Sequence, residues 1–309
     1  MPDLPQTTQV VLMIRPARFR VNPETAGSNS FQSTGHANAV AAARAEFDEL
    51  VSRLEAHGVT TLVFNDTAYP AKPDAVFPNN WVSFHSDGRA MLYPMRALNR
   101  RAERRRDVLE ALAGLGWSIR RTVDLSVLEE DGLALEGTGS LVLDRPGRIA
   151  YAAVSARTDD AALDEFVGRT GYRVHRFHTL HRGLPVYHTN VMLALGRHFA
   201  VICDEVVKPV SARSALLDQL AASGRALVRI NADQMARFAA NLLELDTPSG
   251  PVIAMSASAH DALSPSQLGQ LAEHGALLSV PLPVIESGGG SLRCMLAEVF
   301  LPRKGRVGG

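Results

Sequence analysis

One of the two cysteines in the chain follows a run of glycines. Cys294 ends a stretch that begins at Glu286 and reads Glu-Ser-Gly-Gly-Gly-Ser-Leu-Arg-Cys. Consecutive glycines allow a tight turn and a close approach of the backbone to a ligand, because no Cβ atom restricts either. Such a loop would leave the Cys294 sulfur accessible as a nucleophile. The alternative is a core cysteine at the start of the apolar run 295–301, which is where most free cysteines lie.

Other residue types that a thiol active site uses are spread along the chain. Glu136 and His188 are the candidate carboxylate and imidazole, and Asp74, Asn79, Asn80 and Asn190 add further polar groups. A cysteine attacks as the thiolate, a histidine moves the proton, and a carboxylate fixes the histidine tautomer. Taken one at a time, Glu136 could be a surface charge and His188 a structural histidine. The fold must therefore bring these residues together.

An internal repeat provides such a fold. Apolar runs open at Asn80, Gly139, Asn190 and Asn241, and each continues through a turn into a second apolar run, as in a β-hairpin. Segments typical of helices follow at residues 100–114, 159–168, 211–222 and 264–274, and a short apolar strand comes after each. The repeating unit is strand, strand, helix, strand, with a spacing of about 50 to 60 residues.

A fifth unit is divided between the two ends of the chain. Its helix covers residues 37–57 and its third strand residues 59–64, while the run 294–301 pairs with residues 10–14. Five units in a closed ring bury their sheet edges. The sequence therefore predicts an α/β fold, a five-bladed pseudo-symmetric α/β propeller that forms one catalytic domain over residues 1–309, with 303–309 as a frayed tail. Equivalent residues of successive units should converge on the axis.

Five short motifs carry a resemblance to a known family. They are Asp74-Ala-Val-Phe-Pro-Asn-Asn, Leu135-Glu-Gly-Thr-Gly-Ser, Ser155-Ala-Arg-Thr, His188-Thr-Asn and the glycine-rich loop before Cys294. In this order and repeat phase they resemble the arginine deiminase and amidinotransferase (pentein) superfamily of five-bladed propellers that modify guanidino groups. The N-terminal Met13-Ile-Arg-Pro and residues 22–32 look most like the branch of citrulline-utilisation hydrolases.

This resemblance implies catalytic roles for three residues. Cys294 would attack the central carbon of a guanidino or ureido group. His188 would protonate the departing nitrogen and later activate water, and Glu136 would hold substrate nitrogens and orient the histidine. No metal and no cofactor enters such a reaction.

The same resemblance implies a substrate-binding set. Asp74 looks like a carboxylate of the substrate cradle, beside Asn79 and Asn80. Arg157 and the pair Arg100 and Arg101 stand where relatives grip a substrate carboxylate, a role that suits a bidentate guanidinium. Asn22 and Asn29 belong to the stretch 22–32, whose composition permits a lid over the ligand.

Two asparagines depart from the family pattern. Asn80 and Asn190 stand where deiminases and amidinotransferases usually present aspartates. An asparagine carries no charge and offers both a donor and an acceptor. Because each close ionic hydrogen bond contributes roughly 1.5–3 kcal/mol, their loss should disfavour a cation and favour a neutral ureido group. The interpretation is hydrolysis of citrulline to ornithine, carbon dioxide and ammonia through S-carbamoyl-cysteine. Alternatively, asparagines at these positions and at Asn241 only cap the hairpin backbone.

Other functions remain open from the sequence. An arginine dihydrolase, a deiminase or dimethylarginine hydrolase, and an amidinotransferase would all use the same covalent step. A propeller of this kind also occurs in a ribosome-binding factor without catalysis, and a shared fold does not carry function. The presence of thiol, imidazole and carboxylate at converging positions favours an enzyme.

Composition limits the partners. The 32 basic and 32 acidic side chains cancel, so no broad field attracts nucleic acid or an anionic membrane, and a small amino-acid substrate is the expected partner. Two cysteines make neither a disulfide framework nor a zinc site, and the region of His175, His178 and His181 lacks the regular helix and the further ligands of a metal site. Without a signal segment or a long apolar run, the expected location is the cytoplasm. A homodimer is compatible with the sequence.

Overall fold

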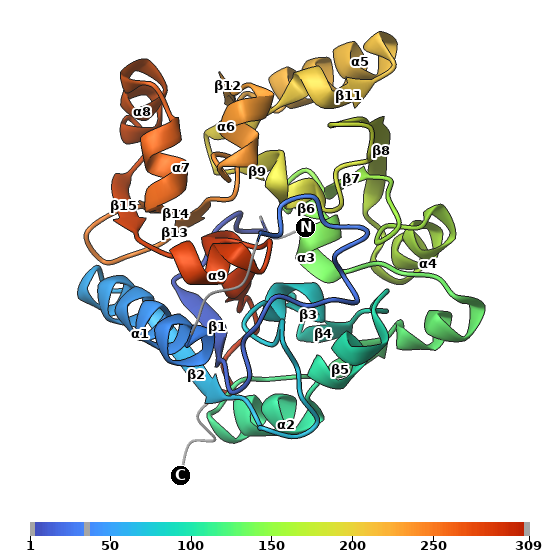
Figure 1. Ribbon diagram of the computed structural model, residues 1–309, viewed down its shortest axis with the longest axis vertical. Helices are drawn as coiled ribbons and strands as arrows, with labels where there is room; N and C mark the ends of the chain where they lie inside the picture. Colours follow the sequence, from blue (N-terminus) through green and yellow to red (C-terminus); the bar gives the residue numbers. More distant parts are fainter. Residues whose placement is uncertain (1–3, 34–37, 306–309) are drawn as a thin grey trace.

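Five small sheets surround a central axis. The computed structural model describes residues 4–33 and 38–305, and Figure 1 shows the sheets arranged as the blades of a ring with the longer helices outside. Four sheets have three strands and one has four. The predicted five-bladed α/β propeller is confirmed, including its repeating unit of hairpin, helix and outer strand.

Each blade has an inner, a middle and an outer strand. The inner strands are β3 (Val82–Phe84), β6 (Val142–Asp144), β9 (Leu193–Leu195), β13 (Leu243–Leu245) and β16 (Ala297–Glu298). The middle strands are β4 (Arg89–Leu92), β7 (Ile149–Ala153), β10 (Phe199–Ile202), β14 (Val252–Ser256) and β1 (Val10–Arg15). The outer strands are β5 (Arg121–Asp124), β8 (Arg173–Thr179), β12 (Ala226–Arg229), β15 (Ala276–Val280) and β2 (Thr60–Asn65), and β11 (Val207–Lys208) pairs with β8.

The pairing pattern is the same in every blade. Inner and middle strands are antiparallel, whereas middle and outer strands are parallel. A parallel pair needs a crossover connection. The crossovers contain α1 (Ala39–Ala56), α2 (Arg106–Gly114), α4 (Asp160–Thr170), α5 (Val210–Ala222) and, with the short α7 (Ala257–Ala262) before it, α8 (Pro265–Ala272). Short helices α3 (Gly137–Ser140), α6 (Ala232–Ala236) and α9 (Pro283–Ser287) lie between blades.

Apolar spacing explains why these segments adopt their structures. The middle strand β1 reads Val-Val-Leu-Met-Ile-Arg, and its four central residues are buried, as expected for a strand covered on both faces. Helix α1 buries Ala43, Phe47, Leu50 and Leu54, which recur every three or four residues and so share one face. The ring is therefore held together by apolar surfaces between neighbouring blades and beneath the outer helices.

The fifth blade joins the two ends of the chain. Val11 pairs with Glu298 and Leu12 with Ala297, so the predicted pairing of the C-terminal run with residues 10–14 is confirmed. The strand is shorter than predicted, because residues Leu292–Met295 form a 3₁₀ turn instead. Cys294 therefore lies in a turn that leads into an inner strand, not in the strand itself.

Two other expectations were wrong in part. The helix predicted over 100–114 begins only at Arg106, and residues Leu98–Glu103 form a 3₁₀ turn that buries Arg100. The predicted tail at 303–309 is partly ordered, because the Arg303 guanidinium lies 3.6 Å from the centre of the Trp117 ring and Lys304 N donates to Gly116 O at 2.8 Å. Residues 306–309, and the start of the first helix at 37, lie outside the described residues.

The described part of the chain contains no helix that is long and apolar enough to cross a bilayer. Across residues 4–33 and 38–305, no group of three or more histidine, cysteine or acidic side chains is arranged to hold a metal ion.

Candidate active site

Short helical turns carry the candidate residues to the axis. A turn precedes an inner strand in four blades: Pro78–Asn80, Gly137–Ser140, Thr189–Val191 and Leu292–Met295. Two glycines permit the close contact of these turns. Gly137 has a φ of +48°, and a Cβ atom there would lie 2.3 Å from Asn79 O; a Cβ at Gly139 would lie 2.7 Å from His188 Nδ1. These positions require glycine because any side chain would push the turns apart.

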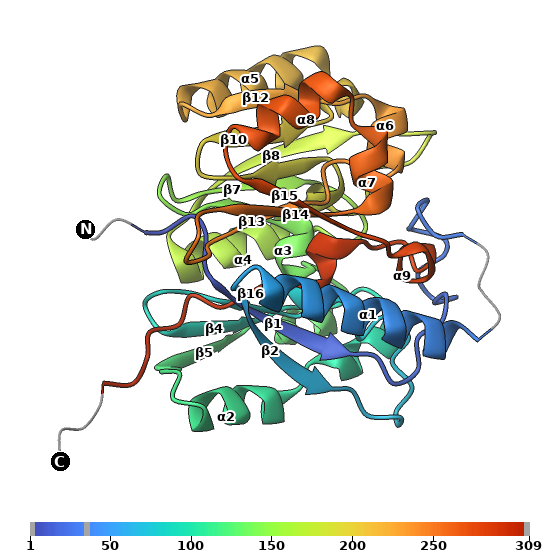
Figure 2. The same ribbon diagram turned by 90° about the vertical axis from the view of Figure 1, so that its left-hand side faces the viewer.

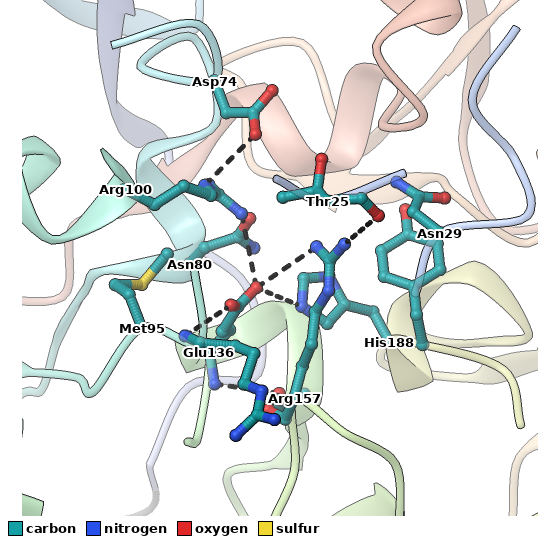
Figure 3. A network of polar contacts seen from close by, with 12 residues as sticks. Thr25, Asn29, Asp74, Asn80, Met95, Arg100, Glu136, Arg157 and His188 are labelled. Carbon is teal, nitrogen blue, oxygen red and sulfur yellow. Dashed lines mark hydrogen bonds and ion pairs between the residues drawn. The ribbon is translucent and has the colours of Figure 1, made fainter. Parts of the chain in front are cut away.

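Glu136 and His188 form a buried pair. His188 Nε2 lies 2.9 Å from Glu136 Oε2 (Figure 3), and both side chains are almost fully buried. An ionised carboxylate can only accept, so the imidazole proton sits on Nε2 and Nδ1 carries the lone pair. The geometry thus presents Nδ1 as the basic atom of His188.

Burial and charge set the protonation of this pair. Burial lowers the pKa of His188 to about 4, although the hydrogen bond that His188 donates to Glu136 opposes the shift. Burial would raise the pKa of Glu136, but Arg157, the His188 hydrogen bond and Arg100 together hold it well below its usual range. At neutral pH the pair is therefore a carboxylate and a neutral imidazole, which is ready to accept a proton.

Amide groups from two blades surround the Cys294 sulfur. Asn190 Nδ2 lies 3.5 Å and Asn241 Nδ2 3.4 Å from Sγ. Asn241 also holds the turn that bears the cysteine, because its Oδ1 accepts from Arg293 N at 3.0 Å and its Nδ2 lies 3.1 Å from Asn190 O. The hairpin-capping reading of Asn241 is thus correct for its backbone contacts, but the same amide also contacts the sulfur.

Arg100 is locked inside the site by other protein groups. Its guanidinium donates to both oxygens of Glu103 at 2.9 and 3.0 Å, to Asn80 Oδ1 at 3.0 Å and to Glu136 Oε2 at 3.3 Å. Asp74 is a fourth partner, with its carboxylate 3.5 Å from the guanidinium. Arg101 points elsewhere, to Glu129 at 3.3 Å. The Arg100 guanidinium therefore orders the carboxylates around it.

Arg157 connects the site to the N-terminal stretch. Nη1 lies 3.5 Å from Glu136 Oε2, while Nη2 donates to Thr25 O at 3.3 Å and to Ser28 Oγ at 3.0 Å. Figure 3 shows this guanidinium between Glu136 and Thr25. Its charge also lies over the Tyr187 ring, 4.9 Å from the centroid.

One carboxylate oxygen of Asp74 has no hydrogen-bond partner among the described residues. Oδ2 accepts from Asn22 Nδ2 at 2.8 Å, whereas Oδ1 is buried without a hydrogen-bond partner in the described residues. Burial raises the pKa of Asp74, and the positive charge of Arg100 opposes that shift. An unpartnered buried acceptor is costly, so it points to a donor that arrives with the ligand.

Arg100 also fixes the orientation of Asn80 and, through it, that of Asn79. Because a guanidinium only donates, Asn80 presents its oxygen to Arg100 and its Nδ2 to Asn79 Oδ1, at 2.8 Å. Asn79 Nδ2 is left buried without a partner in the described residues. Both polar atoms of Asn80 are therefore engaged within the protein.

A narrow cavity lies between these groups. Its lining includes Asp74, Phe77, Arg157, His188, Gly289 and Cys294, and its free volume is about 10 Å³. That is roughly the space of one water molecule. Asn29 closes one side by donating to Gly289 O at 3.2 Å, and Tyr187 donates its hydroxyl to the same oxygen. An amino-acid substrate is larger than this space, so some of the lining groups must move when it binds.

Several residues of the site were not predicted from the sequence. Glu103 is the main partner of Arg100, Thr25 and Ser28 bind Arg157, and Tyr187 lines the cavity. The contact of Asn241 with the sulfur was also missed. Its repeat phase, shared with Asn190, was the signal that could have found it.

Comparison with known proteins identifies the family. A family model described as "N,N dimethylarginine dimethylhydrolase, eukaryotic" matches residues 15–301. The chain belongs to this family. It is therefore a pentein-type hydrolase that acts on carbon–nitrogen bonds of guanidino compounds. The finer placement in the citrulline-utilisation branch stays a prediction. No curated protein matches the sequence significantly.

Solved structures share the fold at low sequence identity. The N-terminal domain of ArgZ, described as an arginine dihydrolase of cyanobacteria, was solved with bound substrate; it has a TM-score of 0.71 and 16% identity over 94% of this chain and 97% of its own. Unliganded AgrE has a TM-score of 0.71 and 19% sequence identity, and the match covers 94% of this chain and 39% of the AgrE chain. A variant of DDAH from Pseudomonas aeruginosa, solved with citrulline, has a TM-score of 0.66 and 15% sequence identity. The match covers 94% of this chain and 99% of the DDAH chain.

Proposed function

We propose that Cys294 attacks the guanidino group of arginine and that the same site then hydrolyses the resulting citrulline to ornithine. The observation that carries this proposal is the free Oδ1 of Asp74, which is buried beside the cavity that Cys294 also lines. A carboxylate that can only accept suits the N–H groups of a cationic guanidinium. The citrulline reaction suggested by the sequence becomes the second of two hydrolyses.

The engagement of Asn80 weakens one argument for a ureido substrate alone. Asn80 gives one N–H to Asn79 and accepts from Arg100, so only its second N–H is left for a urea carbonyl. Arg100, in turn, is held by Glu103 and is not free to grip a substrate carboxylate. The cavity network contains the carboxyl groups of Asp74, Glu103 and Glu136 beside two guanidinium groups, and Asp74 keeps one oxygen free for a further cation.

The first hydrolysis needs only groups already at the site. The Cys294 thiol gives its proton to His188 as its sulfur bonds to the central guanidino carbon. The bond to one terminal nitrogen then breaks, and that nitrogen leaves as ammonia with the proton from His188. His188 Nδ1 then removes a proton from water, whose oxygen bonds to the same carbon as the bond to sulfur breaks. Citrulline and the free thiol result. Glu136 stabilises the imidazolium that forms during this step.

The second hydrolysis uses the same atoms on the ureido group. Attack by Cys294 releases ornithine and leaves S-carbamoyl-cysteine, and water then converts the carbamoyl group to carbon dioxide and ammonia. The amides of Asn190 and Asn241, 3.5 and 3.4 Å from the sulfur, are placed near the oxygen that becomes negative. These neutral donors also favour the second candidate function, hydrolysis of citrulline alone.

The relatives support both candidates. ArgZ is described as an arginine dihydrolase, and DDAH was solved with citrulline. The family description names dimethylarginine as a further substrate. All three compounds present the same carbon to a thiol, so only assays with separate substrates distinguish the functions.

Product stoichiometry provides the test. Under the main proposal, arginine yields two ammonia per ornithine and citrulline yields one. Ornithine from citrulline but not from arginine would establish the second candidate, and dimethylamine release without ornithine would overturn both. The Asp74→Asn variant should raise the KM for arginine about tenfold or more, and that for citrulline by less, because a charged hydrogen bond is lost only with the cation. Asp124→Asn, at an outer strand, is the matched control.

A further inference from the structure

A second, larger cavity lies at the opposite ends of the strands that carry the catalytic groups. Its volume is about 350 Å³. Inner strands β3, β6 and β16 lead from the turns of Asn80, Glu136 and Cys294 to residues His85, Arg145 and Phe300, which line it. In Figure 2 the segments that lead into β1 and out of β16 lie on one side of the molecule, and α9, next to the catalytic loop, lies on the other.

Arg145 is a nearly buried cation without a close partner in this cavity. Its side chain is 6% exposed, and its guanidinium lies 3.8 Å from the centre of the Phe300 ring. The nearest carboxylate, Glu298, is 3.7 Å away and already accepts from Arg293 at 2.8 Å. Within residues 4–33 and 38–305 the Arg145 guanidinium donates no hydrogen bond. A buried charge in this state is unfavourable until an anion pairs with it.

Two more arginines add to the positive charge. Arg148 donates to the carbonyl of Thr170 at 2.8 Å and, among the described residues, forms no ion pair. Arg89 pairs with Asp87 at 2.7 Å, but that carboxylate is half exposed to solvent. Three guanidinium groups thus face one exposed carboxylate and one that Arg293 already holds.

The neighbouring histidine adds no positive charge to the cavity. His85 Nε2 lies 3.0 Å from Ser83 Oγ. Burial, and then the positive charges of Arg145, Arg89 and Arg148, hold the pKa of His85 well below its usual value. The neutral imidazole of His85 therefore adds polar surface, and the arginines provide the positive potential in the cavity.

Much of the remaining wall is apolar. Leu4, Pro5, Pro146, Tyr172 and Phe300 line it together with Ser86 and Asp87, and exposed residues such as Pro5 and Pro146 place the opening at the surface. Apolar walls with a few convergent charged groups, at this volume, are typical of small-molecule sites. We propose that this cavity is a second ligand site for a small organic anion. Its phosphate or carboxylate group pairs with Arg145 and Arg148, and its apolar body contacts Tyr172 and Phe300.

Binding of simple probes tests the proposal directly. Phenyl phosphate and benzoate, titrated into the full chain by calorimetry, should bind with dissociation constants from micromolar to about 1 mM, as expected for ligands of this size. Benzyl alcohol lacks the charge and inorganic phosphate lacks the ring, so each should bind at least about tenfold more weakly. Absence of binding by both aromatic anions, or equal affinity for phosphate alone, would overturn the site as described.

Two variants locate the bound probe. Arg145→Met keeps an apolar stem against Phe300 and should weaken phenyl phosphate about tenfold or more. Arg148→Gln, at a more exposed position with a single carbonyl contact, should also weaken it and guards against misfolding of the first variant. Arg53→Gln on α1 is the matched loss of one surface charge and should leave the affinity unchanged. Wild-type affinity in both cavity variants would show that the anion binds elsewhere and would overturn the proposal.

Discussion

Buried arginines are paired closely with carboxylates at one end of the inner strands but not at the other. At the catalytic end, Arg100 and Arg157 are bonded to the carboxylates Glu103 and Glu136, and the free volume is about 10 Å³. At the other end, Arg145 lacks a close partner and borders about 350 Å³. Strands of three residues or fewer separate the two environments.

This contrast shows what each end is built to accept. A network whose groups already bond to one another holds its reactive atoms in fixed positions, and charge stabilisation then needs little rearrangement during reaction. Among the described residues, the free carboxylate oxygen there is Asp74 Oδ1, and the amide nitrogen of the neighbouring Asn79 is also without a partner. At the far end the free groups are donors. The catalytic end is thus complementary to a donor-rich guanidinium, and the far end to an anion.

Loss of the nucleophile should have the largest effect. In Cys294→Ser, turnover of arginine and citrulline should fall about 10⁴-fold or more, because the oxygen replacing the sulfur is a far weaker nucleophile at this site. The buried turn should still fold. Steady-state kinetics and a thermal unfolding curve check both statements.

The second cysteine supplies the control. Cys203 lies in the core, and burial raises the pKa of its thiol to about 12, so it is inert. Cys203→Ala should lose about 1–2 kcal/mol of stability from the vacated volume and keep wild-type kcat. Full activity in the Cys294 variant, or its loss in the Cys203 variant, would contradict the assignment of the nucleophile.

Neutralising the central carboxylate should have the next largest effect. Glu136→Gln no longer fixes the His188 tautomer and leaves two buried guanidinium groups without their shared anion, so kcat should fall about 10³-fold and the melting temperature should drop. Glu129→Gln is matched, since Glu129 binds Arg104 and Arg101 outside the cavity. It should lower stability without changing kcat; an equal loss of kcat in both variants would remove the special role of Glu136.

The pH dependence of stability should report the buried imidazole. With the pKa of His188 lowered to about 4, only the unfolded chain takes up this proton between pH 4 and 6.5. The free energy of unfolding should therefore rise with pH across this window, by on the order of 3 kcal/mol from this group. Stability is lost as pH falls towards 4.

A variant isolates that contribution. Burial raises the pKa of Glu103 to about 7, which lowers stability as pH rises from about 4.5 to 7 and so opposes the His188 effect in both proteins. The difference between wild type and His188→Asn in chemical denaturation at each pH cancels this background. A difference that stays constant from pH 4 to 6.5 would show that the histidine is not buried neutral.

Much of this arrangement could be read from local sequence signals. Apolar runs, turns and helix ends repeat at a fixed spacing, and the spacing alone put Glu136, His188 and Cys294 at equivalent ends of inner strands. The position of Arg100 could not be read in this way. Residues 100–114 have helix-forming composition, but the pairing of Arg100 with Glu103 and Glu136 holds the segment in a 3₁₀ turn instead. The pair with Glu136, 36 residues further along the chain, depends on tertiary contacts that a local sequence pattern does not encode.

The smallest predicted effect concerns the residue whose role the repeat phase left undecided. Asn241→Ala removes one amide from the Cys294 sulfur and one cap from the turn at Arg293, so kcat should fall about 10- to 100-fold. Asn231→Ala removes an asparagine that only caps α6, and it should cost about 1 kcal/mol of stability without lowering kcat. If Asn241→Ala behaves like Asn231→Ala, this asparagine is a backbone cap alone, and the catalytic end uses only Asn190 as an amide donor. A loss of kcat at unchanged KM would instead place Asn241 among the groups that act on the reacting atoms.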